Sequence, residues 1–135
     1  MFHTIQSDED IRYFLEKTNS LHDGHILEAR YEHNGITKTE NGHRIYPAKT
    51  KLILKILVTS IWDAVVDLEF ECLSEWQIKG DGLNMISTTV MFSKNKQIVW
   101  TDDAYVTMEN LKKGSYIIAG SMKWRITEQE LTCEN

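Results

Sequence analysis

Two imidazoles and a carboxylate occur within four residues, at His22, Asp23 and His25. Neutral imidazole and carboxylate oxygen suit zinc, iron or manganese, and a histidine beside an aspartate can also act as an acid–base pair. The alternative is structural: Asp23 caps a turn, and His22 hydrogen-bonds backbone groups at the end of a sheet. We favour the structural interpretation, because a four-coordinate metal needs ligands that this sequence does not plainly supply.

A second cluster of candidate residues, Trp100-Thr101-Asp102-Asp103, lies at the end of a predicted strand. Alternation places Asp102 on the inward face, where a carboxylate requires a hydrogen-bond donor, a histidine or a metal. The simpler alternative, which we favour, ends the strand at Asp102 and starts a loop with the two carboxylates.

The two groups form one site only if the strands that carry them are antiparallel neighbours. The strand that begins after Asp23 would then start beside Asp102, and we expect His22, Asp23 and Asp102 to lie together at one end of the sheet. The candidate ligands for any metal are His22, Asp23, His25 and Asp102.

Signatures of other chemistries are not found. The sequence contains no GxSxG nucleophile motif and no glycine-rich phosphate loop, and no cofactor is predicted. Cys72 and Cys133 lack metal-ligand or redox spacing, and two free thiols are typical of a reducing compartment. Trp62 stands beside Asp63 in a turn, where an exposed indole could anchor a partner. Trp100 is the other tryptophan among the candidate binding residues.

Composition narrows the range of partners. The 135 residues are 41% hydrophobic and carry a net charge of −5, which predicts one domain over 1–128 with a proper core and a frayed tail over 129–135. Nucleic acid and anionic membranes attract basic surfaces, so neither is expected as a partner. No stretch is long and apolar enough to span a bilayer, and no secretory leader is visible, so we expect a cytoplasmic protein.

The start of the chain predicts a helix of about three turns. Ser7 can cap it, with acidic residues following at the positive end of the helix dipole. Ile11, Phe14, Leu15 and Thr18 then recur at helical spacing and form one stripe that can lie on a sheet. Asn19 can take the left-handed conformation after the last turn.

From Gly24 onward the period changes to two, which predicts strands. The segment 34–50 carries two Asn-Gly dipeptides and is expected to be a long surface excursion that could form a hairpin. The segment 51–60 is apolar on both faces, as in a central strand. A three-residue loop at 94–96 pairs Phe92 with Ile98 and Val90 with Trp100, and keeps both apolar sets on one face.

Two long strands are expected to alternate between inward and outward side chains. In the first, an inward run continues to the end of the strand; in the last, Gly120 suggests a bulge or a close backbone approach. The inward residues are Val66, Leu68, Phe70, Cys72, Trp76 and Ile78 in the first strand, and Tyr116, Ile118, Met122, Trp124 and Ile126 in the last. The fold class that follows is α+β: one N-terminal helix packed on a mostly antiparallel sheet of about seven strands, curled into a sandwich or open barrel.

Several short motifs resemble a group of small, uncharacterised bacterial proteins. These carry a Phe-His-Asp or Leu-His-Asp loop ahead of a mostly β domain, and some are similar to immunity proteins of polymorphic toxin systems. The motifs are Leu21-His22-Asp23, the strand start at 24–29, the paired strands 53–58 and 66–70, Trp100-Thr101-Asp102, and Trp124-Arg125. Leu21 departs from the commoner Phe. The resemblance implies a binding protein that neutralises a partner, and it carries over no catalytic residues.

The sequence therefore favours a non-enzymatic binding module over an enzyme. An acidic strand face at Asp67, Glu69, Glu71 and Glu75 would suit a basic, toxin-like protein partner. The alternative is a metal-assisted hydrolase that uses His22, Asp23, His25 and Asp102.

Overall fold

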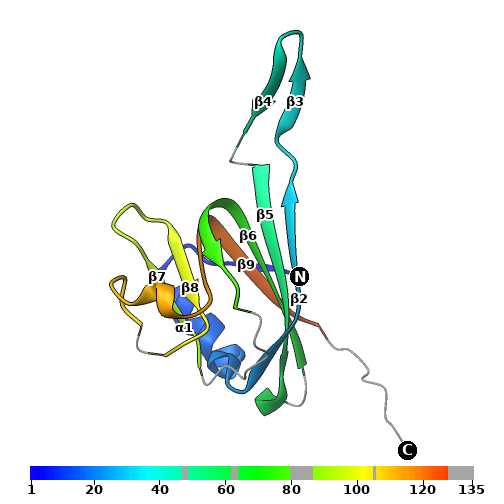
Figure 1. The fold of residues 1–135 in the computed structure, drawn as a ribbon. Coiled ribbons are helices and arrows are strands. Elements are labelled where there is room, and N and C mark those ends of the chain that lie inside the picture. The colour runs from blue at the N-terminus through cyan, green and yellow to red at the C-terminus, as the bar shows by residue number, and fades with distance from the viewer. Residues whose placement is uncertain (47–48, 62–63, 80–86, 105, 128–135) are drawn as a thin grey trace, which may run out of the picture.

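The computed structural model describes residues 1–46, 49–61, 64–79, 87–104 and 106–127. It confirms the predicted class: one α-helix and a mostly antiparallel sheet of seven strands that does not close into a barrel (Figure 1). The elements are β1 (His3–Thr4), α1 (Asp8–Lys17), β2 (Gly24–His33), β3 (Ile36–Thr39), β4 (Gly42–Ile45), β5 (Thr50–Val58), β6 (Ala64–Gln77), β7 (Thr89–Phe92), β8 (Ile98–Thr101) and β9 (Tyr116–Thr127). Short 3₁₀ turns lie at Asn19–Leu21, Thr59–Ile61 and Leu111–Lys113.

The strand order is β2-β5-β6-β9-β8-β7, with β1 paired to β9 beyond the end of β8. Helix α1 begins as predicted, because the Ser7 hydroxyl accepts from the Asp10 N–H and the Asp10 carboxylate accepts from the Gln6 N–H. Its buried stripe packs on the concave side of the sheet, where the Phe14 ring meets the Trp124 ring at a centroid distance of 5.3 Å. The helix thus closes one side of the core.

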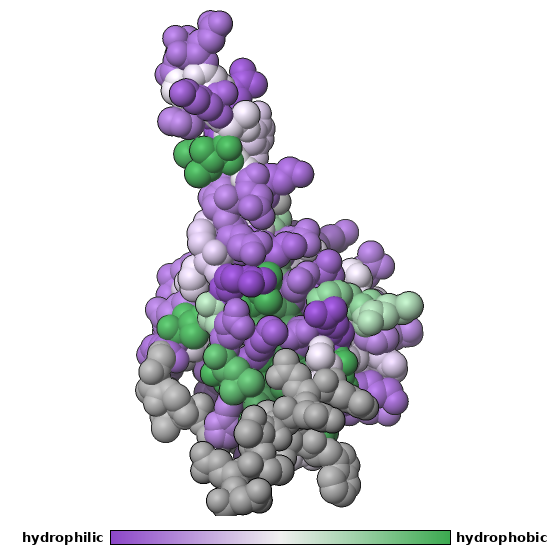
Figure 2. Space-filling view, turned by 90° about the vertical axis from the view of Figure 1, so that its right-hand side faces the viewer, coloured by the Kyte–Doolittle hydropathy of each residue, from purple (hydrophilic) through white to green (hydrophobic). Residues whose placement is uncertain are grey.

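Strands β3 and β4 form a separate two-stranded arm. They continue the line of β2 and β5 beyond the main sheet, so that a narrow hairpin projects from the body (Figure 1). The expected excursion at 34–50 is therefore a hairpin; Pro47 lies outside the described residues. The arm is mostly hydrophilic, with an apolar patch near its base (Figure 2).

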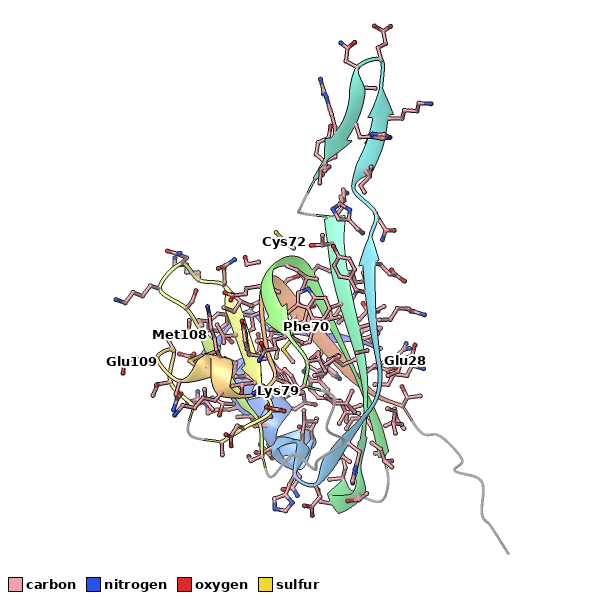
Figure 3. The ribbon with its side chains drawn as sticks, in the orientation of Figure 1. Glu28, Phe70, Cys72, Lys79, Met108 and Glu109 are labelled. Atoms are coloured by element: carbon pink, nitrogen blue, oxygen red, sulfur yellow. The ribbon has the colours of Figure 1, made fainter. Side chains whose placement is uncertain are left out.

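The sheet is creased where Cys72 of β6 faces Gly120 of β9. Cys72 has a φ of +57°, and a Cβ built on Gly120 would lie 2.9 Å from the Cys72 Cβ, so the close approach expected at Gly120 is confirmed. A register shift follows between Leu73 and Glu75. Figure 3 shows Cys72 at the bend, with Phe70 inside it.

The crease corrects the predicted facing of both long strands. The inward stripe of β6 passes from Phe70 to Leu73, which leaves Cys72 exposed and Trp76 39% exposed. On β9 the core residues are Ile117 and Ala119 rather than Tyr116 and Ile118, which pack in a smaller cluster with Val99 and Leu111. The prediction was wrong there because it assumed one uninterrupted alternation through a sharply bent backbone.

The predicted hairpin between β7 and β8 is confirmed. Phe92 pairs with Ile98 and Val90 with Trp100, and Lys96 in the loop is left-handed with a φ of +60°. Strand β5 lies inside the sheet, between β2 and β6, as expected, but it is not covered on both sides: its inward residues are buried, whereas the other face carries the partly exposed Lys51 and Lys55. Ile78, just beyond the end of β6, packs against the core as expected.

The convex face of the sheet is an alternating array of charges. Across the strands β2, β5, β6 and β9, one row reads Glu28-Lys55-Asp67-Arg125, the next Arg30-Ile53-Glu69-Lys123, and the third Glu32-Lys51-Glu71-Ser121. Opposite charges face each other in each row, which stabilises the register. Asp67 is buried and accepts from Arg125 Nε at 2.8 Å and from the Thr127 hydroxyl at 3.0 Å.

Candidate functional site

The turn that joins α1 to β2 is the most strained segment among the described residues. Asn19, Ser20 and Leu21 have φ values of 51°, 55° and 52°, and Asp23 follows with 57°. A left-handed conformation costs a non-glycine residue about 1–2 kcal/mol. The left-handed Asn19 was predicted; the three further positive φ values were not. Such strain persists only where the surroundings hold it, and it is common at functional sites.

Contacts from two neighbouring segments hold this turn. The Ser60 hydroxyl donates to the His22 carbonyl oxygen at 2.7 Å and accepts from Asn19 Nδ2 at 3.1 Å. On the other side the Thr88 N–H donates to the Ser20 carbonyl oxygen at 2.9 Å. Leu21 is fully buried in the core between these contacts. The turn is therefore fixed in place by the β5–β6 connection on one side and by the segment that leads into β7 on the other.

The fixed turn presents His22 and Asp23 side by side. His22 Nδ1 lies 3.1 Å from Asp23 Oδ2, and both side chains are half exposed. This contact selects the tautomer with the proton on Nδ1 when the ring is neutral, and leaves Nε2 as the free nitrogen. His25 lies on β2 opposite Leu57 and forms no described ion pair with His22 or Asp23.

His22 lines a depression of about 500 Å³. The other lining residues are Leu15, Ser87, Thr88, Thr89, Val90 and Ala104. The Thr88 hydroxyl donates to the Thr101 carbonyl oxygen and the Thr89 hydroxyl to that of Asp103, so both hydrogens are already used. A ligand here would meet an apolar floor, hydroxyl acceptors and one imidazole nitrogen.

Asp102 does not join the histidine pair. Its carboxylate accepts from the Ser115 N–H at 3.1 Å, and its own N–H donates to the Ser115 carbonyl oxygen at 3.2 Å. The site hypothesis required β2 and β8 to be antiparallel neighbours. This expectation was wrong, because β5, β6 and β9 lie between them in the sheet. Strand β8 ends at Thr101, and the Asp102 carboxylate bonds to backbone at the start of the loop that follows, where the simpler alternative had placed it.

The remaining site candidates either belong to the core or lie outside the described residues. Trp100 is fully buried against Phe70, with a ring centroid distance of 6.2 Å, and its indole nitrogen has no hydrogen-bond partner within the described part of the chain. It is a core residue and cannot touch a partner at the surface. Trp62 and Cys133 lie outside the described residues, as does the predicted tail at 129–135. Among the described side chains, no three His, Cys, Asp or Glu residues converge as metal ligands would.

The half-buried Asp102 gives a pH-dependent prediction. Burial raises the pKa of the Asp102 carboxyl above its ordinary value, against the opposing hydrogen bond from Ser115. A folded-state pKa above the unfolded one gives stability that is full below the unfolded pKa and is lost as the pH rises through the folded pKa. Asp102→Asn keeps an accepting oxygen but cannot ionise. Its free energy of unfolding should therefore rise relative to the parent as the pH rises from below the ordinary carboxyl pKa through the raised pKa of Asp102.

Urea denaturation at several pH values measures this difference. Asp103→Asn is the matched control, since it removes a neighbouring charge and leaves the half-buried Asp102 carboxyl in place. A difference between Asp102→Asn and the parent that stays constant over the whole range would contradict the prediction.

Sequence reasoning missed the exposed apolar side chains of the arm. Ile36 of β3 and Ile45 of β4 are cross-strand partners and are 56% and 63% exposed. A signal was present in the sequence. The two isoleucines stand at the outer ends of two polar segments, 37–39 and 42–44, that are joined through the turn dipeptide Asn41-Gly42.

No helix among the described residues is long and apolar enough to cross a membrane. In comparisons with known proteins, no family model, no curated protein and no solved structure matches this chain.

Proposed function

We propose that this protein is a non-enzymatic binding module that recognises a protein partner through the β3–β4 arm. The observation that carries the proposal is the pair of exposed isoleucines on a hairpin that stands away from the body (Figure 2). A two-stranded ribbon gains little stability by itself, so apolar side chains on its surface contribute most when a partner buries them. Tyr46 at the base is also exposed and adds an aromatic contact.

The charges of the arm favour an acidic patch on the partner. Lys38, Arg44 and Lys49 outnumber Glu40 in this part of the chain, whereas the whole protein has a net charge of −5. Complementary charge at the rim of an interface speeds association and orients the partner.

The carboxylates of the acidic strand face are paired within the protein, which argues against a basic partner. Glu69 and Glu71 form ion pairs with Lys123, Asp67 pairs with Arg125, and Glu75 accepts from the Tyr116 hydroxyl at 2.7 Å. The Tyr116 hydrogen bond and then Lys112 lower the pKa of Glu75, which keeps it ionised and paired. Carboxylates neutralised in this way project little potential toward solvent.

The more specific form of the proposal is an immunity-like protein that neutralises its partner by covering it. The metal-assisted hydrolase gains no support from the geometry, because Asp102 faces Ser115 and no third ligand joins His22 and Asp23 among the described residues.

Site-specific photo-crosslinking in cells tests the use of the arm. With a photoreactive phenylalanine analogue at Ile45, we expect one discrete adduct, and with the analogue at Met108 we expect none. Met108 is a matched control because it is 49% exposed but lies on the body near the 3₁₀ turn at Leu111–Lys113 (Figure 3). Adding Ile36→Ser should remove the adduct without changing the thermal midpoint, because Ile36 is exposed.

Equal adducts at both positions, or an adduct that survives Ile36→Ser, would count against the arm. The immunity-like form has its own test: co-expression with the product of the neighbouring gene should relieve toxicity of that product, and the Ile36→Ser/Ile45→Ser variant should not. If this variant protects as well as the parent, neutralisation does not depend on the arm.

A further inference from the structure

Strand β2 leaves one long edge of the main sheet open. It pairs with β5 on one side, and no other described strand pairs with it on the other. The opposite end of the sheet is β7, which has only four residues. An open edge presents unpaired N–H and C=O groups that can pair with another strand. Figure 3 places Glu28 on this edge, away from the rest of the sheet.

The backbone direction along this edge follows from one hydrogen bond. The Asn34 N–H donates to the Lys49 carbonyl oxygen, directly beyond the His33–Thr50 pair that ends the ladder with β5. In an antiparallel ladder the direction alternates from residue to residue. The N–H and C=O groups of Ala29, Tyr31 and His33 therefore point to the open edge.

The side chains make this edge complementary to itself in one register. Antiparallel pairing centred on Tyr31 sets Arg30 opposite Glu32 of a second copy, twice by symmetry, and sets Glu28 opposite the neutral Asn34. Centring the pair on Arg30 sets Arg30 against Arg30 and Glu28 against Glu32, and centring it on Glu32 sets two Glu32 side chains together. Like charges directly opposite destabilise a strand pair, so both alternatives are disfavoured.

The bulge in β2 limits the pairing to one segment. The register with β5 shifts between Ile26 and Glu28, which leaves Leu27 out of the ladder. A register centred on Ala29 would extend into this bulge in both copies. Centred on Tyr31, the paired segment is 28–34 in each copy and avoids it. Among the registers centred on residues 29 to 32, the one centred on Tyr31 therefore satisfies both charge and backbone geometry.

We propose that the occupant of the β2 edge is a second copy of this chain, paired antiparallel over residues 28–34 about a two-fold axis at Tyr31. The contact is isologous, as in most homodimers. It joins the two main sheets into one, and the two arms point in opposite directions. The inference goes beyond the proposed function, because it uses the backbone edge of β2 rather than the side chains of the arm. A contact of this size predicts a reversible, concentration-dependent dimer.

Sedimentation analysis of the full chain from micromolar to millimolar concentration tests the proposal. The parent should show a monomer–dimer equilibrium. Arg30→Glu places Glu opposite Glu32 at both symmetric positions, and should raise the dissociation constant about tenfold or more. Glu32→Arg should do the same. The double variant Arg30→Glu/Glu32→Arg exchanges the charges, and should restore the dissociation constant to within about threefold of the parent.

A backbone variant tests the edge independently of charge. Tyr31→Pro removes an N–H that points to the open edge and is not used by β5, so the fold should persist, as circular dichroism can show, while the dimer is lost. In the parent, the amide hydrogens of Ala29, Tyr31 and His33 should exchange more slowly as concentration rises. A monomer at every concentration overturns the proposal. So does a dimer that Arg30→Glu and Tyr31→Pro leave unchanged, because its interface would lie elsewhere.

Discussion

Phe70→Ala and Trp124→Ala should each lower the free energy of unfolding by about 3–5 kcal/mol, the usual cost of truncating a buried aromatic side chain. Phe70 is fully buried, lies between Leu52 of β5 and Met122 of β9 in the register, and faces the Trp100 ring. Trp124 joins the sheet to the helix: its ring stacks on His3 at 4.6 Å and meets Phe14 edge-on. Each truncation leaves a cavity at a point where several elements meet.

Urea denaturation measures both losses. Trp76→Ala is the control, because Trp76 lies on the same strand as Phe70 but beyond the crease, where it is exposed and stacks on Tyr31. It should cost about 1 kcal/mol or less. A loss below about 1 kcal/mol for Phe70→Ala, or a loss for Trp76→Ala equal to that for Phe70→Ala, would show that β6 does not change its inward face at Cys72.

Gly120→Ala should lower the free energy of unfolding by about 1–3 kcal/mol, the usual cost of overpacking a tight site. The new Cβ would lie 2.9 Å from the Cys72 Cβ, an atom close to the backbone that cannot rotate away. The backbone at the crease must therefore move, and both long strands pass through it.

A second substitution makes this prediction specific. Cys72→Gly removes the opposing Cβ and also suits the φ of +57° at that position, so adding it to Gly120→Ala should recover most of the lost stability. Ser121→Ala, at the exposed neighbouring position, should have little effect. If Cys72→Gly does not recover stability, the cost of Gly120→Ala has a source other than this contact.

Local interactions made several elements predictable from the sequence. The cap at Ser7 and the apolar stripe of α1 depend on residues within a few positions of each other, and the Phe92–Ile98 register depends on a three-residue loop. The close approach at Gly120 was also predictable, because a glycine inside a strand pattern usually marks a bulge or a point where two backbones come close.

The order of the strands was not predictable in the same way. The site hypothesis required β2 and β8 to be neighbours, but strand order is decided by pairings between distant segments, such as Asp67 with Arg125. The facing of Trp76 and Tyr116 failed for a related reason. Cys72 carries no sequence signal for a left-handed conformation, and a single such residue changes which side chains point inward from there onward.

The central position of β9 has a consequence for how the protein folds. β9 pairs with β6, β8 and β1, yet it follows all of them in the sequence, and its contact between Asp67 and Arg125 closes a loop of 58 residues. Such long-range pairing is formed late, because the entropy of loop closure must be overcome first. During synthesis the inner edge of β6 stays open until residues 116–127 have emerged. That interval, rather than the finished fold, is when this chain is most exposed to aggregation.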